Sequence, residues 1–315
     1  MAFLKRAAVP IRHGLRQIGL GRVPFIRAFG PSPDGLAALL ESGFPGTAQR
    51  LAAAGSWGVD WHRAATSFIV PGPGGPLAHA GMLPLPVTIH GAVHEVGYIH
   101  AVCTRPDRRG GGLARAVIEA ALRASDRRHK TQILLTNDPV LYSRFGFRTV
   151  PEHVVRLVLD QPTGGRTGLA ERLLATVRGH PRLLAQILGG RLPVSRELGV
   201  GPERPLYTLN ECLSPLWWLP DLGVVVSWEL ENGVLALYDV AGPVLPDLDT
   251  LLRHAPGPVS EVVFHFSPDR FLKDGQTGGL AGTAYAVPVG PGPVLMARGP
   301  FTRADALVML PRPWR

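Results

Sequence analysis

A glycine-rich turn is the segment of this sequence with the clearest potential for chemistry. Residues 102–117 read VCTRPDRRGGGLARAV, so an apolar stretch ends near Thr104 and helical apolar spacing begins directly after Gly112. Backbone N–H groups in such a turn converge with the unpaired N–H groups at the start of a helix, and together they can bind phosphates. Glycines lack the Cβ atoms that would hold a phosphate away from these amides. The segment therefore predicts a diphosphate site.

Arginines add positive charge to this turn at positions 108, 109 and 115. Two familiar phosphate loops do not match, because no Gly-Lys-Ser/Thr follows and the G-x-G-x-x-G spacing is absent. A flexible glycine turn before an ordinary helix is the structural alternative, and the three glycines alone do not exclude it.

Two motifs in order resemble the GNAT superfamily of N-acetyltransferases. Arg109-Gly-Gly-Gly-Leu-Ala114 is similar to its acyl-CoA loop, Arg/Gln-x-x-Gly-x-Gly/Ala. Downstream, Asn137, Tyr142 and Gly146-Phe147 are similar to the family pattern Asn…Tyr-x-x-x-Gly-Phe. The resemblance implies a mixed-sheet α/β fold, acetyl-CoA as co-substrate and no metal.

The resemblance also implies which residues contact the cofactor. The backbone between Val102 and Thr104 is expected to pair with the pantetheine arm, and one of its N–H groups to polarise the thioester carbonyl. The full set expected to contact acetyl-CoA is Val102, Cys103, Thr104, Arg108, Arg109, Gly110, Gly111, Gly112, Leu113, Ala114, Arg115 and Asn137.

Proton transfer requires an acid and a base. Tyr142 matches the acid position of the family, although an ordinary half-buried aromatic residue has the same sequence context. His100 is a candidate base because it lies on the strand that leads into the turn; a core histidine is an equal alternative, and Glu95 is a second candidate. Cys103 suggests an acyl-cysteine intermediate, but buried cysteines usually act as small hydrophobic residues, and direct transfer is the family norm.

The resemblance implies an N-acetyltransferase that moves acetyl from acetyl-CoA to a primary amine of an unidentified acceptor by direct attack. The alternative is a catalytically silent acyl-CoA-binding sensor or scaffold. Nucleic acid is not expected as a partner, because no recognition helix or aromatic-basic stripe accompanies the net charge of +9.

The elements that position the turn alternate between strands and helices. Apolar patterns predict strands near 67–70, 77–85, 93–104, 131–136 and 154–159, with helices over 35–42, 47–54, 112–124 and 138–145. The breakers at 71–76 predict a loop tip. This order predicts a compact α/β unit in which a helical crossover joins parallel strands.

The second half predicts a similar order of elements. Strands over 223–230 and 234–241 flank Asn232-Gly233, a strong hairpin signal, and a helix over 247–254 and strands over 259–266, 284–289 and 294–298 follow. A helix is also predicted over 168–188. We therefore expect two tandem GNAT-like units, the second degenerate, because Val240–Pro246 lacks the arginine and the glycine spacing. The predicted ranges are 1–34 for a basic arm, 35–160 for the cofactor-binding domain, 161–205 for a connector and 206–315 for the second domain.

Composition limits the remaining possibilities. Cys103 and Cys212 are far apart in sequence, which fits a reducing compartment, and we expect a cytoplasmic protein. Apolar runs are only strand-length, so no membrane span is expected. Trp217, Trp218 and Trp228 suit either a substrate cleft or the core. The oligomeric state and the acceptor are left open by the sequence.

Overall fold

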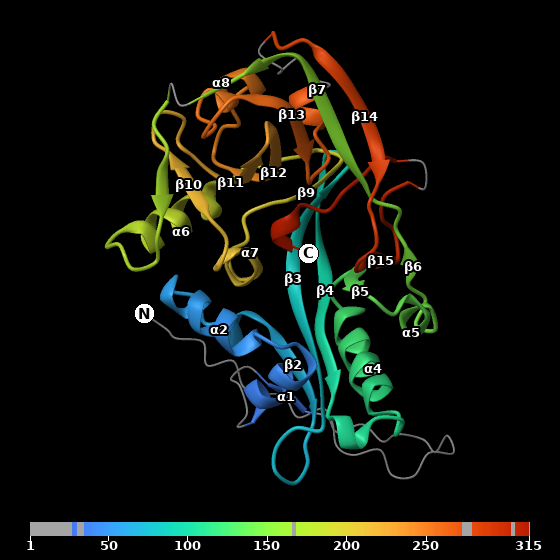
Figure 1. The fold of residues 1–315 in the computed structure, drawn as a ribbon. Coiled ribbons are helices and arrows are strands. Elements are labelled where there is room, and N and C mark those ends of the chain that lie inside the picture. The colour runs from blue at the N-terminus through green and yellow to red at the C-terminus, as the bar shows by residue number, and fades with distance from the viewer. Residues whose placement is uncertain (1–26, 30–34, 166–167, 273–278, 304–305, 315) are drawn as a thin grey trace, which may run out of the picture. The chain divides into compact units, whose positions relative to one another are not determined.

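The computed structural model describes residues 27–29, 35–165, 168–272, 279–303 and 306–314 (Figure 1). It divides into two compact units: unit 1 comprises Met1–Gln49, His62–Leu83 and Tyr98–Arg128, and unit 2 comprises Arg50–Trp61, Pro84–Gly97 and His129–Arg315. Strands β3 (Ala78–Ile89) and β4 (Ala92–Thr104) each contribute residues to both units. The predicted basic arm lies outside the described residues except for β1 (Arg27–Phe29).

Unit 1 is a strand meander covered by helices. Strand β1 pairs antiparallel with β2 (Thr66–Val70), and β2 pairs antiparallel with β3 through the loop at 71–76, as predicted. Helix α1 (Leu36–Gly43) packs Leu36, Leu39 and Leu40 against Ile69 and Cys103. Helix α4 (Leu113–Ser125) buries the predicted apolar face, which comprises Val117, Ile118, Ala121 and Leu122.

The buried side chain of His79 stabilises the distorted backbone of β4 at Ala101. Ala101 has a φ of 50°, in the left-handed region that non-glycine residues rarely adopt. The ring of His79 lies 2.8 Å from the Ala101 carbonyl oxygen through Nδ1 and 3.1 Å from Ser67 Oγ through Nε2. Burial lowers the pKa of His79 to about 4 and that of His100 to about 3. Both rings are therefore neutral at neutral pH.

Unit 2 contains a seven-stranded sheet in the order β14-β7-β13-β12-β11-β10-β8. These strands are β14 (Gly282–Pro288), β7 (His153–Thr163), β13 (Val259–Phe264), β12 (Val234–Ala241), β11 (Val224–Glu231), β10 (Leu216–Leu219) and β8 (Glu171–Leu173). The predicted hairpin between β11 and β12 is confirmed: Asn232 and Gly233 have φ values of 51° and 81°, as a type I′ turn requires. Trp228 belongs to the core of this sheet, and Trp217 packs against that core.

The remaining elements complete both units. They are α2 (Thr47–Ser56), α3 (Trp61–Ala64), the 3₁₀ turns Pro106–Arg108 and Arg312–Trp314, β5 (Gln132–Thr136), α5 (Pro139–Ser143), β6 (Arg148–Thr149), α6 (His180–Gly190), β9 (Leu198–Val200), α7 (Pro205–Glu211), α8 (Leu248–Leu252), α9 (Asp269–Leu272) and β15 (Val294–Arg298). None of the helices in the described part of the chain is long and apolar enough to cross a membrane.

Strands β7 and β15 of unit 2 each lie in a different sheet from the strand that precedes them in sequence. Strand β15 lies between β5 and β6 and pairs antiparallel with both. Strand β7 follows β6 in sequence but lies between β13 and β14 in the other sheet, as the green strand beside orange ones shows in Figure 1. Each half of the sequence thus supplies one strand to the sheet of the other half. Neither predicted range, 35–160 or 206–315, holds all the strands of its sheet.

The helix predicted over 168–188 is wrong in its first part. Residues Glu171–Leu173 form β8, which pairs with Leu216–Trp218 of β10, and the helix begins only at His180. Pairing with a distant strand overrides the local helical pattern. The sequence analysis also missed α7 and β10, which supply residues of unit 2 that are discussed below.

A buried ion pair joins α6 to the sheet of unit 2. Arg191 follows α6 and donates two hydrogen bonds, of 2.6 and 2.8 Å, to Asp239 on β12. Both side chains are fully buried. Such a bidentate pair fixes the position of the helix, because either charge alone would be strongly destabilising in the core.

The strand exchange predicts that neither half folds alone. Cutting the chain between residues 165 and 166 leaves β7 on the first piece and β15 on the second. Separately expressed pieces should therefore lack a cooperative thermal transition, whereas coexpressed pieces should associate and restore it. Differential scanning calorimetry and size-exclusion chromatography measure both outcomes. A first piece that is monomeric and unfolds cooperatively by itself would contradict the exchange.

The buried histidines predict that the protein loses stability in mild acid. Their pKa values are lowered by folding, so between about pH 6.5 and 4 the unfolded chain binds more protons than the folded one. The free energy of unfolding should fall over this window by several kcal/mol, since one pKa unit corresponds to about 1.4 kcal/mol. Urea unfolding at pH 7, 6 and 5 measures the slope. His100→Gln should flatten it, while the control His94→Gln, at an exposed position, should not.

Candidate functional site

The predicted phosphate turn lies at the end of β4 in unit 1. Strand β4 ends at Thr104, a 3₁₀ turn spans Pro106–Arg108, and α4 begins at Leu113. Gly110 and Gly112 have φ values of 79° and 74°, a conformation that glycine adopts without the strain other residues incur. The sequence pattern therefore corresponds to a tight turn that leads directly into a helix.

Several backbone N–H groups in this turn donate no hydrogen bond to the rest of the described backbone. Within the described residues, no backbone hydrogen bond uses the N–H of Gly110, Gly111 or Gly112. The N–H groups in the first turn of α4 have no partner inside the helix, and Gly112 provides no side-chain cap. A Cβ atom added to Gly110 or Gly112 would meet no atom within 4 Å, so the space in front of the turn is open. A ligand oxygen can approach these donors.

The arginines around the turn differ in how far their charge is compensated. Arg105 donates to Asp107 through Nε and Nη2 at 2.6 and 3.0 Å, and this bond lowers the pKa of the Asp107 carboxyl. Arg108 lies 3.4 Å from Asp107, and Arg115 pairs with Glu119 at 2.8 Å. Arg109 donates only a long bond of 3.5 Å to the Thr104 carbonyl and forms no ion pair in the described chain. Arg109 therefore has the charge most available to an anion.

The strand before the turn presents backbone rather than reactive side chains. The Cys103 side chain packs into the α1 cluster, and burial raises the pKa of its thiol to about 12. A thiol that stays protonated is a poor nucleophile, which argues against an acyl-cysteine intermediate. The positive φ of Ala101, fixed by His79, interrupts the regular strand immediately before Val102. The sequence analysis missed His79, because only the cross-strand neighbour reveals its partner.

The two candidate bases have unfavourable surroundings. The His100 ring stacks on Tyr98 and fills the space that a side chain at Gly81 would occupy. With a pKa of about 3, it is a weak proton acceptor. Glu95 is exposed near the start of β4 and pairs with His129 at 3.3 Å. Neither arrangement favours a catalytic base.

Tyr142 and Asn137, from the second motif, belong to unit 2. Asp138 caps helix α5 by accepting the Leu141 N–H at 3.1 Å, which positions the helix directly after β5. The Tyr142 ring is 7% exposed and packs edge-to-face on Phe147, with centroids 6.1 Å apart. Asn137 is exposed. Their roles toward a cofactor rest on the motif that they share with the family.

Comparisons with known proteins agree with the two motifs. Residues 74–150, which include both, match the model of the acetyltransferase (GNAT) domain. No curated protein matches the chain.

Solved structures extend the likeness to most of the chain. A probable N-acyltransferase from Enterococcus faecalis V583 is 13% identical, with a TM-score of 0.54 over 87% of this chain and 72% of that one. A GCN5-related N-acetyltransferase from Anabaena variabilis is 15% identical, with a TM-score of 0.54 over 87% and 72% of the two chains. Another, from Kribbella flavida, is 15% identical, with a TM-score of 0.52 over 87% and 71%.

At these identities the solved structures show the fold, which is the predicted α/β fold with mixed sheets. The domain model shows the enzyme class, which is that of the acyltransferases. Residues 74–150 therefore match an acetyltransferase (GNAT) domain, and the chain resembles solved N-acyltransferases in its fold.

Proposed function

We propose that this protein transfers acetyl from acetyl-CoA to a primary amine by direct attack of the amine on the thioester. The observation that carries the proposal is the open turn at Gly110–Gly112, with its unused N–H groups and the uncompensated charge of Arg109. These residues fit a diphosphate, because they supply converging donors and positive charge and leave space in front.

The cofactor-binding residues divide by the group that they contact. The N–H groups from Gly110 to Ala114 and the Arg109 guanidinium bind the diphosphate. Arg108 and Arg115 contribute a weaker field, because each already pairs with a carboxylate. The backbone from Val102 to Thr104 pairs with the pantetheine arm. Asn137 donates a hydrogen bond to that arm. Acetyl-CoA, when bound, supplies the activated acetyl group.

Tyr142 is the residue to which we assign proton transfer. Its phenol donates a proton to the departing thiolate, a role that the packing on Phe147 supports by fixing the ring. His100, the other catalytic candidate, is given no proton-transfer step because its pKa of about 3 makes it a weak base. The amine must therefore reach the thioester in its neutral form without help from His100.

The second half of the chain, residues 206–315, is in this proposal a degenerate copy that binds no cofactor. Strands β12 and β13 are parallel and are joined through α8, which repeats the strand-helix-strand order. At the start of α8, however, the Asp247 carboxylate accepts the Thr250 N–H at 2.8 Å. An aspartate at this position satisfies the donor and repels a phosphate, whereas α4 begins at a glycine.

The loop assignment predicts a loss of acetyl-CoA affinity in two variants. Arg109→Gln removes a charge-assisted hydrogen bond and should weaken binding about 10- to 100-fold, or roughly 1.5–3 kcal/mol. Gly112→Asp adds a negative charge and strain at a positive φ, and should abolish binding. Isothermal titration measures both, with Arg123→Gln at the far end of α4 as the control that loses one charge elsewhere. Unchanged affinity in both loop variants would reject the assignment.

The acid assignment predicts that Tyr142→Phe separates binding from turnover. The variant keeps the ring that packs on Phe147, so acetyl-CoA affinity should remain within about twofold while kcat falls about 100-fold. A thiol-release assay across a panel of primary amines measures turnover. Full turnover in this variant would remove Tyr142 from the mechanism. Binding without thiol release from the unmodified protein would favour a sensor over an enzyme.

A further inference from the structure

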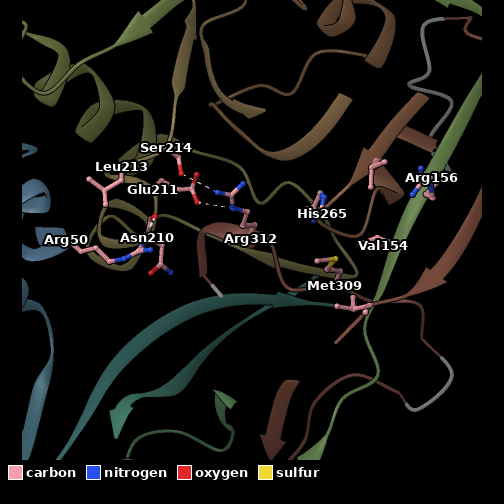
Figure 2. A pocket seen from close by; sticks show the side chains of 13 residues that line it. Arg50, Val154, Arg156, Asn210, Glu211, Leu213, Ser214, His265, Met309 and Arg312 are labelled. Carbon is pink, nitrogen blue, oxygen red and sulfur yellow. Dashed lines mark hydrogen bonds and ion pairs between the residues drawn. The ribbon is translucent and has the colours of Figure 1, made fainter. Parts of the chain in front are cut away.

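A cavity of about 710 Å³ opens in unit 2, outside the residues assigned to the cofactor (Figure 2). Its walls come from the start of unit 2 at Arg50, from β7 and β13, from α7 and the residues after it, and from the C-terminal segment. Val154, Val263 and Met309 give it apolar surface. The cavity is large enough for a small organic molecule.

Arginines dominate the charge of this cavity. Figure 2 shows Arg312 between Arg50 on one side and Arg156 on the other. Among the described residues that line the cavity, the only carboxylate is Glu211. The lining therefore carries an excess of positive charge.

Arg312 is held in place with donors to spare. Its guanidinium lies 3.7 Å from the centroid of the Tyr238 ring, and its Nη2 donates to Ser214 Oγ at 3.3 Å. Its contact with Glu211 is long, 3.7 Å from Nε to Oε1. A guanidinium held over a ring in this way has further N–H donors, and two of them can bind a planar oxyanion.

Glu211 compensates this charge incompletely. Its side chain is 2% exposed and accepts a hydrogen bond of 2.8 Å from Ser227. Burial raises the pKa of the Glu211 carboxyl, and the nearby Arg312 opposes this shift. Because Glu211 accepts its short hydrogen bond from Ser227 and lies 3.7 Å from Arg312 Nε, N–H donors of Arg312 are left for a ligand.

The two other arginines of the cavity, Arg156 and Arg50, differ in whether an acidic residue pairs with them. Arg156 forms an ion pair with Glu261, which reduces its contribution. Arg50 is exposed, donates a long bond of 3.4 Å to the Asn210 carbonyl, and forms no ion pair within the described chain. Arg50 and Arg312 are thus the pair of cations with capacity for a ligand.

We propose that this cavity binds a small organic oxyanion, a carboxylate or a phosphate carried on an apolar body. Arg312 and Arg50 hold the oxyanion, and Val154, Val263 and Met309 contact the apolar part. The inference concerns unit 2 alone and does not depend on acetyl transfer.

The test uses the full chain in the absence of acetyl-CoA. It compares small aromatic anions with an aromatic amine of similar shape and opposite charge. Isothermal titration with 4-phenylbutyrate and with phenyl phosphate should show saturable binding, and titration with 4-phenylbutylamine should show none. Arg50→Gln should weaken binding of both anions at least about tenfold, because a charged donor is lost. Arg182→Gln, an exposed arginine on α6, serves as the control and should have no effect.

A single substitution of Arg312 would leave the buried Glu211 carboxylate without a nearby cation. Arg312 and Glu211 are therefore replaced together. The double variant Arg312→Gln/Glu211→Gln avoids this, and it should also weaken anion binding at least about tenfold while retaining a cooperative thermal transition. Arg109→Gln should leave binding of 4-phenylbutyrate unchanged, which separates this site from the phosphate-binding cofactor turn. Absence of anion binding, equal binding of the amine, or anion binding unaffected in both the Arg50 and the double variant would overturn the proposal.

Discussion

The exchange of β7 and β15 between two sheets is the constraint on which unit 2 depends. Leu295, Met296 and Ala297 of β15 are buried between β5 and β6, so these strands cannot complete their hydrogen bonds without residues from the end of the chain. Helix α5, with Tyr142, lies between β5 and β6 in sequence. The placement of this catalytic candidate thus depends on a strand more than 150 residues away.

The beginnings of two helices show how one residue separates a ligand site from a structural end. Helix α4 begins at Gly112, which leaves the first N–H groups to an external anion. Helix α8 begins at Asp247, whose carboxylate satisfies the Thr250 N–H from within. The same strand-helix order therefore supports a phosphate in the first half and opposes it in the second. This contrast agrees with a cofactor site in one half alone.

Burial changes the chemistry of several side chains that could react in water. Cys103 stays a thiol and His100 stays neutral, because the charged forms are disfavoured away from solvent. His79 acts on the backbone instead, as a partner of the Ala101 carbonyl next to the proposed pantetheine-binding strand. In unit 2, Glu211 is buried but lies 3.7 Å from Arg312 Nε, so N–H donors of Arg312 are left for a ligand.

The sequence by itself determined the features that depend on local physics. The positive φ of Gly110 and Gly112, the Asn232-Gly233 hairpin and the apolar face of α4 each follow from a few adjacent residues, and they located the proposed cofactor turn. It did not determine the strand exchange, the partner of His79, or the meeting of Arg50, Glu211 and Arg312 around one cavity. These features depend on residues far apart in the chain, as does the pairing of Glu171 with Trp218, which replaced the first part of a predicted helix. Only the tertiary structure decides such contacts, because local patterns set the elements and long-range burial sets their partners.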